Sequence, residues 1–566
     1  MGRELELWAF DTEDDGHGGW ILGGVTNGKE IYHYKQAETM RRALEACPPN
    51  VRLVAHNLEY DLGNLYRDCY GELDPTWNRA SLISARVKGK RVRYWDSMRH
   101  APISLAKMGK IIGLEKKEIA YHKMRHMATE KVAEYLDRDC EILWRFMDKV
   151  QRTYLSMGGE LKSTLPSSAL NLFKAWKQGI YCAKPVDEDL LEILKTSYYG
   201  GRTEAFYRGN VKKAHYSDVH SMYPWTMLGN FPNFHVVSHR APREGECGII
   251  EATVSIRDWM PPLPYKSGKL TFPEGKFRGT WTREEIDRMG VSVDKIHGGI
   301  TFPVTAGPIL ADYVKRLYDL RLKSKGDEFG NWFYKLLMNS LYGKFAASPK
   351  IYHLFAEDEF LERTEASAGC ICAQRKVWDG SLYLCQMTPT GYPVDTNYIW
   401  SSIITGRARI RLWEDAHAVM KRGGKIYYTD TDSLIYSGSP LENNSELGRW
   451  GTDEIKDLEI KGPKMYRIGD EYTVKGVPAK GMDEYGHPTR PAKDFFTKGK
   501  CVFRRPVRMR EALKRRAARN PRTSEEHAIP NYWVDIEKVY GNKETKRLWE
   551  GETGWSKPLV ISETGR

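Results

Sequence analysis

Asp430 and Asp432 stand at the tip of a predicted β-hairpin. Apolar or aromatic residues run up to Tyr428 and resume at Leu434, as expected for two strands joined by a tight turn. Because side chains alternate along a strand, both carboxylates should point to the same side. Two like charges so close repel unless a cation lies between them, and oxygen-only ligands favour Mg²⁺ or Mn²⁺. An ordinary Asp-rich turn is the alternative interpretation.

A third carboxylate, Asp218, ends another predicted strand, and Pro224 is placed at the expected first position of the helix that follows. Two metal ions about 3.5–4 Å apart would need such a third acid, and such an ion pair catalyses phosphoryl transfer. Tyr223 could lie under a nucleotide sugar, where it would exclude a 2′-hydroxyl and favour deoxynucleotides.

Lys335, Asn339 and Tyr342 have the spacing of one helix face, with Leu337 and Leu341 on the buried side. A cation, an amide and an aromatic ring in one stripe are unusual for a core. They suit a wall over an incoming nucleotide, with Lys335 on the triphosphate. A chance arrangement on a helix surface is the alternative.

Two further segments suit nucleic-acid contact. Gly343 would let a base approach closely. Lys464 and Tyr466 alternate onto one strand face, where they could hold a primer terminus through phosphate and sugar.

The N-terminal part carries a second set of acids with a tyrosine and an asparagine. One pair ends a strand, and two pairs are one helical turn apart. The set is Asp11 and Glu13, Asn57 and Asp61, and Tyr135 and Asp139. Each pair alone is common, but all three in order point to a second metal-dependent site.

The elements that must position these residues need several domains. A chain of 566 residues exceeds one hydrophobic core, so roughly two to four domains are expected. The 87 Lys and Arg against 74 Asp and Glu give a net charge of +13, which suits a polyanionic partner, although solubility alone would explain it. The pattern predicts an α/β and α+β multidomain fold, with a compact domain over 1–155 and a linker over 156–197.

Other composition features exclude several classes. No apolar run approaches the ~20 residues of a membrane span, and no signal peptide is apparent. Nine scattered cysteines favour a reduced, cytoplasmic protein without structural zinc. The basic stretch near the C-terminus predicts a helix over 510–519.

The polymerising motifs resemble those of family-B DNA polymerases, in the same order. They are Asp218-Val-His-Ser-Met-Tyr-Pro224, Lys335-x-x-x-Asn339-Ser-Leu-Tyr-Gly343, Tyr428-x-Asp-Thr-Asp-Ser433 and Lys464-x-Tyr466. The resemblance implies that Asp218 and Asp432 bind two Mg²⁺ or Mn²⁺ ions, with Asp430 supporting, and that dNTPs are the substrates. It also implies that Thr405 and Arg407 contact the template strand. Tyr198, Gly200 and Gly201 would belong to a joint between the synthetic and the editing activity.

The N-terminal motifs resemble the ribonuclease-H-like 3′–5′ proofreading exonuclease of the same family. That resemblance implies two metals on Asp11, Glu13, Asp61 and Asp139, and a water oriented by Tyr135. The implied contacts with single-stranded DNA are Asn57, Ser97, Lys116 and Tyr121. The polymerase domain would then be a right hand over 198–566, with the palm about 198–240 and 401–490, fingers about 311–349 and a basic thumb about 491–566.

Length and layout resemble the protein-primed subgroup of bacteriophages and linear plasmids. That subgroup has two insertions, expected here about 240–310 and 350–400, which contact the priming protein and encircle DNA. One departure is Asn331, where the subgroup often has a lysine; Lys323 could compensate. The implied partners are template-primer DNA, single-stranded DNA and a terminal protein, with a monomeric enzyme and no membrane.

The expected reaction is attack by a primer 3′-hydroxyl, or a protein hydroxyl at initiation, on the α-phosphate of a dNTP. A polymerase that starts without any primer would share every motif. A catalytically silent nucleic-acid-binding scaffold is disfavoured because all seven acids are present. An exonuclease alone would leave residues 200–566 unexplained.

Overall fold

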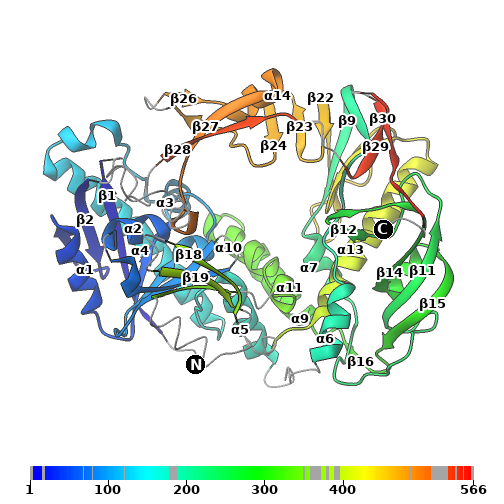
Figure 1. Cartoon of the computed structure of the whole chain (residues 1–566), viewed down its shortest axis with the longest axis horizontal. Helices are drawn as coiled ribbons and strands as arrows, with labels where there is room; N and C mark the ends of the chain where they lie inside the picture. The colour runs from blue at the N-terminus through cyan, green and yellow to red at the C-terminus, as the bar shows by residue number, and fades with distance from the viewer. Residues whose placement is uncertain are drawn as a thin grey trace.

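The computed structural model describes most of the chain (Figure 1). The described ranges are 4–15, 19–67, 69–78, 81–119, 121–177, 188–347, 351–356, 371–377, 382–387, 395–483, 487–511, 533–541, 545–551 and 554–562. An N-terminal domain lies at the left of Figure 1 and a second large sheet at the right, with an arch of strands above and helices below.

The N-terminal domain is built on a ten-stranded sheet of order β18-β19-β17-β5-β6-β7-β4-β1-β2-β3. Its first seven strands are β1 (Glu6–Asp14), β2 (Trp20–Thr26), β3 (Ile31–Tyr34), β4 (Val51–Ala55), β5 (Leu73–Asn78), β6 (Ser81–Val87) and β7 (Arg93–Asp96). β1 runs parallel to β4 and antiparallel to β2.

The described part of this domain contains the helices α1 (Ala37–Glu45), α2 (Leu58–Leu65), α3 (Leu105–Ile111) and α4 (Thr129–Ser156). Short 3₁₀ turns are η1 (Tyr70–Glu72), η2 (Ser97–Arg99) and η3 (Tyr121–His126). α4 packs on β1 and β2 because Leu136, Leu143 and Phe146 recur at helical spacing and are buried.

The segment 156–197, predicted to be a linker, contains α5 (Leu165–Lys177) and α6 (Glu188–Thr196). α5 is part of a packed core, since the ring of Phe173 lies 6.0 Å from that of Tyr313 and 6.3 Å from that of Phe345.

The second large sheet has the strand order β24-β23-β22-β9-β21-β20-β8, extended by β30 on β9 and β29 on β30. The bounds are β8 (Thr203–Ala205), β9 (Tyr207–Val219), β20 (Ile426–Asp430), β21 (Ser433–Tyr436), β22 (Trp450–Gly462), β23 (Met465–Ile468), β24 (Glu471–Val474), β29 (Arg547–Trp549) and β30 (Gly554–Pro558). The long helix α13 (Tyr398–Lys421) packs against β20 and β21, with Leu412 and Leu434 in a shared core.

The region predicted as a first insertion forms a separate sheet of order β15-β11-β14-β31. Its elements are β11 (Gly248–Ile256), β14 (Glu274–Thr282), α8 (Arg283–Arg288), β15 (Ser292–Thr301) and β31 (Val560–Ile561). Smaller strands are β10 (Phe231–Pro232), β12 (Tyr265–Ser267), β13 (Lys269–Thr271) and β16 (Thr305–Gly307). The helix α7 (Met222–Thr226) follows β9.

Helices α9 (Ala311–Lys323), α10 (Glu328–Met338) and α11 (Tyr342–Phe345) occupy the predicted fingers region. α9 and α10 form a helical hairpin, and α10 reaches the N-terminal domain, where Phe146 and Phe329 have ring centroids 5.7 Å apart.

The region predicted as a second insertion supplies β17 (Ile351–Ala356), β18 (Ile371–Val377) and β19 (Leu382–Met387). β17 pairs with β5, so these strands extend the N-terminal sheet.

The arch contains β25 (Gly481–Met482), β26 (Pro488–Thr489), α14 (Pro491–Lys498), β27 (Lys500–Pro506) and β28 (Trp533–Val539). The predicted helix over 510–519 lies mostly outside the described residues. The last strands differ from the predicted thumb, since β30 pairs with β9 and β31 with β14.

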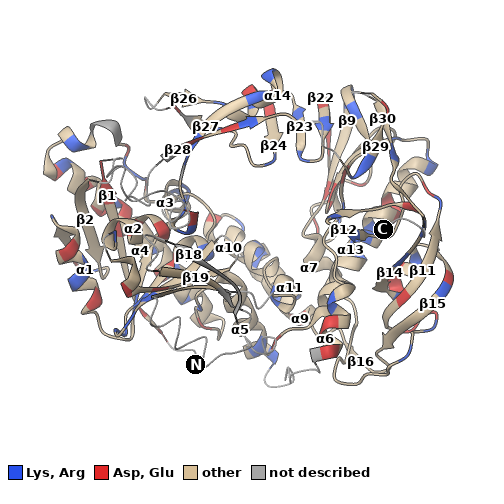
Figure 2. Ribbon diagram, viewed as in Figure 1, with Lys and Arg blue, Asp and Glu red and all other residues tan. Residues whose placement is uncertain are grey.

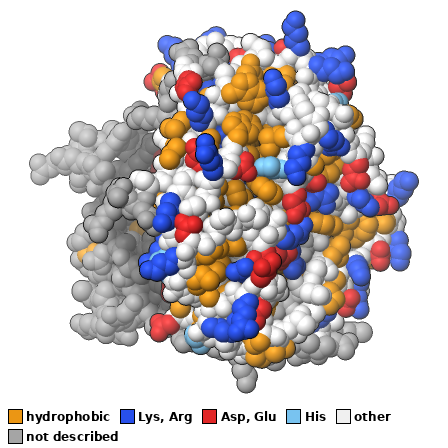
Figure 3. All heavy atoms as spheres, turned by 90° about the vertical axis from the view of Figure 1, so that its right-hand side faces the viewer, with side chains coloured by type: hydrophobic (Ala, Val, Ile, Leu, Met, Phe, Trp, Pro, Cys, Tyr) orange, Lys and Arg blue, Asp and Glu red, His pale blue; other side chains and the backbone are white. Residues whose placement is uncertain are grey.

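Lys and Arg are distributed over every part of the chain (Figure 2). On the face shown in Figure 3, both signs of charge alternate with apolar side chains, and Arg278 pairs with Glu251 at 2.7 Å. Among the described residues, none of the helices combines the length and apolar character needed to cross a bilayer.

Candidate active sites

Asp218 and Asp432, here called the hairpin acid pair, are brought together by strand register. β21 runs antiparallel to β9 with Ser433 opposite Asp218, and the Val219 amide donates to the Asp432 carbonyl at 2.9 Å. The predicted hairpin is confirmed, because β20 ends at Asp430 and β21 begins at Ser433. Thr431 in the turn has a φ of +63°.

The electrostatics of the hairpin acid pair reflect its burial and mutual repulsion. Burial, reinforced by Asp218, raises the pKa of Asp432 to about 6, while Lys335 acts in the opposite direction. Burial also raises the pKa of Asp218, against the charges of His220 and Lys335. The positive charge of Lys335 therefore acts on both acids.

Asp430 is engaged differently from its neighbour. Its Oδ1 accepts from the Thr203 hydroxyl at 2.8 Å, and its Oδ2 lies 2.9 Å from the Lys464 ammonium. The Lys464 amide donates to the Tyr428 hydroxyl at 3.0 Å, and the ring of Tyr466 lies 5.2 Å from that of Tyr428. Lys464 and Tyr466 are thus adjacent to the acidic turn.

The rings of Tyr223 and Tyr342 meet with centroids 4.3 Å apart. Burial raises the pKa of Tyr342 to about 12. Tyr223 lies in α7, which begins at Met222, so Pro224 is its third residue and the predicted first position is wrong.

The prediction of one continuous helix through Lys335, Asn339 and Tyr342 is also wrong. α10 ends at Met338, Asn339 caps it by donating from Nδ2 to the Lys335 carbonyl at 2.8 Å, and Tyr342 begins α11. The Lys335 carbonyl thus accepts both from this side chain and from the Asn339 backbone amide at 3.3 Å.

The predicted buried side of this segment is confirmed, since Leu337 and Leu341 are both 0% exposed. A Cβ added at Gly343 would meet nothing within 4 Å, so the space beside it is open. Lys323 ends α9 with an exposed side chain.

The predicted joint lies directly behind the acidic turn. A Cβ at Gly201 would come within 2.7 Å of the Thr431 side chain, so only glycine fits there. Gly200 is exposed, and the ring of Tyr198 lies 6.3 Å from that of Tyr398.

Thr405 and Arg407 were predicted to contact the template strand, but in the structure they are engaged with other parts of the protein. Thr405 is 1% exposed and its hydroxyl donates to the Ser401 carbonyl at 3.0 Å. The Arg407 guanidinium lies 2.9 Å from Glu284, so both groups already have protein partners.

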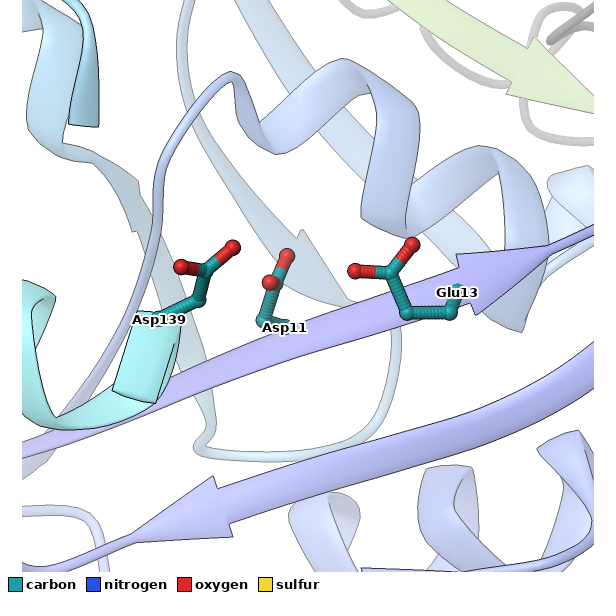
Figure 4. A group of neighbouring side chains, drawn as sticks. All are labelled: Asp11, Glu13 and Asp139. Carbon is teal, nitrogen blue, oxygen red and sulfur yellow. The ribbon is translucent and has the colours of Figure 1, made fainter. Parts of the chain in front are cut away.

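Asp11, Glu13 and Asp139 converge in the N-terminal domain, as Figure 4 shows. Each offers a carboxylate oxygen within 4.8 Å of the other two, and they come from β1 and α4. With Asp61 they are here called the N-terminal acid cluster. No such group of three includes Asp218, Asp430 and Asp432 among the described residues.

Asp61 lies beside these three carboxylates and is 0% exposed. Its Oδ1 accepts from the Thr12 hydroxyl at 2.8 Å, and Thr12 accepts from Asn64 at 3.0 Å. Burial, with the charge of Asp11, raises the pKa of Asp61. Because Thr12 alternates with Asp11 and Glu13 on β1, it reaches Asp61 from the other side of the strand.

Lys116 supplies the positive charge of this cluster. Its ammonium contacts Asp139 and lies 2.6 Å from the Tyr135 hydroxyl. Burial and neighbouring acids nevertheless raise the pKa of Asp11 to about 7 and raise that of Glu13, and burial raises that of Asp139. Lys116 therefore lies inside the cluster, whereas a strand contact was predicted for it.

The other residues predicted to contact single-stranded DNA include Asn57 at the start of α2 and Ser97 in η2. Asn57 is exposed with a φ of +68°, and its amide donates to Asp96 Oδ1 at 3.1 Å. Ser97 is 0% exposed, with its hydroxyl 2.9 Å from His56 Nδ1. Tyr121 lies in η3, but its side chain is outside the described part.

The oxygen donors of the N-terminal acid cluster fit divalent cations. Asp61 Oδ2 and Asp139 Oδ1 are buried without a hydrogen-bond partner, as expected of oxygens that need a positive ligand. A set made only of carboxylate oxygens suits Mg²⁺ or Mn²⁺.

Sequence reasoning missed three residues that brace these acids, namely Thr12, Asn64 and Thr203. Thr12 and Thr203 stand next to motifs, which is a weak signal.

Residues 88–376, just over half of the chain, match the family described as DNA polymerase type B, organellar and viral. The chain belongs to this family. It is 29% identical over 415 residues to the DNA-directed DNA polymerase of Enterobacteria phage PRD1, covering 69% of this polymerase and 68% of the phage enzyme. It is also 25% identical over 401 residues to a probable DNA polymerase of Podospora anserina, but spans only 33% of that protein.

The fold of this polymerase is similar to that of phi29 DNA polymerase. A complex of that enzyme with primer-template DNA and incoming nucleotide superimposes with a TM-score of 0.70 at 17% identity, covering 96% of this chain and 100% of the other. A complex with single-stranded DNA gives a TM-score of 0.65 at 18% identity, covering 87% and 90%. The multidomain polymerase architecture is therefore shared.

Proposed function

We propose that this family-B polymerase carries out template-directed DNA synthesis at the hairpin acid pair. The observation that carries the proposal is the register of β9 and β21, which sets Ser433 opposite Asp218 and so brings Asp218 beside Asp432. A primer 3′-hydroxyl attacks the α-phosphate of a dNTP, and pyrophosphate leaves. Two bound Mg²⁺ ions would activate the attacking oxygen and neutralise the leaving group.

The side chains around the pair have distinct roles in this proposal. Lys335, whose charge already acts on both acids, binds the triphosphate, with Lys323 and Asn339 alongside. Tyr223 lies under the sugar and excludes a 2′-hydroxyl, while Tyr342 and Gly343 border the nascent base pair. Catalysis then consists mainly of positioning and charge neutralisation.

The primer terminus is held beside Asp430. Lys464 reaches Asp430 at 2.9 Å, so its ammonium is close enough to the turn to bind a primer phosphate. Tyr466 contributes its ring from β23. The prediction that Lys464 shares a strand face with it is wrong, because β23 begins at Met465 and Lys464 lies in the preceding turn with a φ of +54°.

We infer a second activity, 3′–5′ removal of mispaired ends, at the N-terminal acid cluster. Three carboxylates within 4.8 Å of one another and Asp61 beside them support binding of two metals. Tyr135 orients the attacking water, and Lys116 partly offsets the negative charge of the acids. Asn57, which is exposed, would contact the single strand, whereas the predicted contact through Ser97 is wrong because that side chain is fully buried against His56.

A closed circuit of contacts supports a polymerase that surrounds its DNA (Figure 1). The arch touches the N-terminal domain where the Met509 amide donates to Glu59 at 3.3 Å and Arg510 lies 4.3 Å from the Tyr352 ring centroid. α14 of the arch packs against β24, the last strand of the second large sheet. Such a ring would favour processive, strand-displacing synthesis by a monomer.

Initiation from a protein hydroxyl is the proposed mode of priming, by a terminal protein that contacts the first insertion. The experiment compares primed DNA, naked single-stranded template, and template with the candidate terminal protein, each with dNTPs and Mg²⁺. Extension of the primed DNA and of the terminal protein, but not of naked template, supports the proposal. Products on naked template alone would instead indicate primer-independent initiation. No extension of primed DNA would refute the polymerase assignment.

A further inference from the structure

Arg409 and Glu285 form an ion pair in the interior of the polymerase. Their side chains are 1% and 0% exposed. Arg409 donates from Nε and Nη2 to Glu285 Oε1 at 2.9 and 2.7 Å. Arg409 belongs to α13, which packs against the second large sheet, and Glu285 belongs to α8 in the first-insertion region. The ion pair between them therefore joins these two regions.

The remaining donors of Arg409 are directed at the joint segment. Nη1 donates to the carbonyls of Tyr199 and Gly200 at 2.8 and 2.9 Å. A planar guanidinium can hold a carboxylate and two carbonyls at once, whereas a lysine ammonium cannot reproduce that fork. Arg409 thus fixes two consecutive peptide groups.

Glu285 is itself held in place before it meets Arg409. Its Oε2 accepts from the Thr282 hydroxyl at 2.8 Å in a capping box at the start of α8. Gly406 leaves room for this carboxylate, since a Cβ there would lie 3.1 Å from Oε2. The carboxylate is therefore a rigid anchor for the guanidinium.

The clamped segment leads directly to the acidic turn. Gly201 is packed against Thr431, the Thr431 amide donates to the Arg202 carbonyl at 2.6 Å, and Thr203 holds Asp430. β8 pairs with β20 at Thr203 and Asp430. A shift of Tyr199 and Gly200 would consequently move the turn that carries Asp432.

We propose that Arg409, anchored by Glu285, is a positioning residue that sets the acidic turn through the joint segment. This inference rests on the proposed role of Asp432 in synthesis. Neither residue reaches the reacting atoms, so their effect is on the geometry of the acids.

The test uses the full-length polymerase with Arg409→Met, and with the double variant Arg409→Met and Glu285→Gln. The single variant leaves a buried carboxylate unpaired and is expected to lower thermal stability. The double variant removes both charges while Gln keeps the capping box, so its thermal midpoint should return toward that of the wild type. The matched control is Arg288→Met. It breaks a solvent-exposed ion pair between the same two helices, in which the Arg288 guanidinium lies 2.7 Å from the Glu414 carboxylate.

Synthesis on primed DNA and degradation of a single-stranded oligonucleotide are measured for each variant, with the Mg²⁺ dependence of both. Both Arg409 variants should lower kcat for synthesis on the order of 10- to 100-fold and raise the Mg²⁺ concentration for half-maximal synthesis, with KM for dNTP nearly unchanged. Degradation should keep its rate and Mg²⁺ dependence in the double variant. Arg288→Met should leave both activities unchanged.

Normal synthesis in the double variant would overturn the positioning role, because the pair would then act only on stability. Proportional loss of synthesis and degradation would overturn it as well. Asp432→Ala in the same series tests the catalytic assignment separately: loss of synthesis there, with normal synthesis in the double variant, refutes only the positioning role.

Discussion

The N-terminal acid cluster and the hairpin acid pair use the same chemistry but are assembled differently. In the cluster, acids from a strand and two helices meet in a buried space, with Glu13 and Asp139 only 5% and 3% exposed. In the pair, β9 supplies Asp218 and the turn between β20 and β21 supplies Asp432, and both acids stay partly exposed. Strand register is enough to build the second site, whereas the first depends on packing between helices and a sheet.

The balancing charges differ as well. Lys116 contacts an acid of the cluster directly, whereas Lys335 acts on the pair from a helix that reaches over it, and Lys464 holds only Asp430. A direct contact makes the cluster sensitive to one cation, while Lys335 acts on both acids of the pair through its charge.

The largest expected effect separates the two sites completely. Asp432→Ala should lower DNA synthesis by about 10³-fold or more, because a metal-binding carboxylate of the transition state is lost. Degradation of single strands should continue at the wild-type rate, as measured on a labelled oligonucleotide. Loss of both activities in a folded variant would disprove the two-site assignment.

The reciprocal change is Asp11→Ala. It should lower single-strand degradation by a similar factor and leave primer extension intact, because β1 belongs to a different sheet from β9 and β21. Mispaired primers should then accumulate rather than be trimmed, which gel electrophoresis of a mismatched primer would show. Continued trimming would remove Asp11 from the proposed site.

Lys116→Met tests the direct cation. Removing it should lower degradation by roughly 10- to 100-fold, since groups that support metal ligands have effects of this size, and synthesis should not change. Lys117→Met is the matched control, because Lys117 makes an exposed pair with Glu134 at 3.0 Å. Equal effects of the two substitutions on the degradation rate would contradict the role given to Lys116.

The smallest effect concerns stability in the absence of metal. Because the pKa of Asp11 is raised to about 7 from an ordinary value of about 3.9, the folded protein retains a proton that the unfolded chain loses. The contribution of Asp11 to stability therefore falls as pH rises from about 4 to about 7. For Asp432 the corresponding window ends near the pKa of about 6.

In a chelating buffer, Asp11→Asn should thus raise the thermal midpoint above pH 7 and have little effect near pH 4. Asp432→Asn should give a smaller gain. Thermal scans from pH 4 to 8 with excess chelator measure both, and added Mg²⁺ should cancel the advantage. A larger gain in thermal midpoint for Asp432→Asn than for Asp11→Asn would contradict the prediction that the more buried acid gives the larger effect.

Local patterns predicted much of both sites. Alternation and turn chemistry predicted the hairpin at Asp430 and Asp432 correctly, and the apolar spacing predicted the burial of Leu337 and Leu341. The helix through Lys335 and Tyr342 was wrong because periodicity does not show that Asn339 caps α10. Thr405 was placed on DNA from its motif, yet its hydroxyl is inside α13, since a motif does not tell which side of a helix is covered.

The sequence by itself determined which acids are available, in what order, and that two of them stand on one tight turn, because turn chemistry and side-chain alternation act over a few residues. Only the tertiary structure decided that Asp218 lies beside Asp432, that Lys116 enters the acid cluster, and that Arg409 reaches Glu285 and the joint. Those contacts join residues far apart in the chain, and they depend on strand register and packing, which no short stretch of sequence specifies.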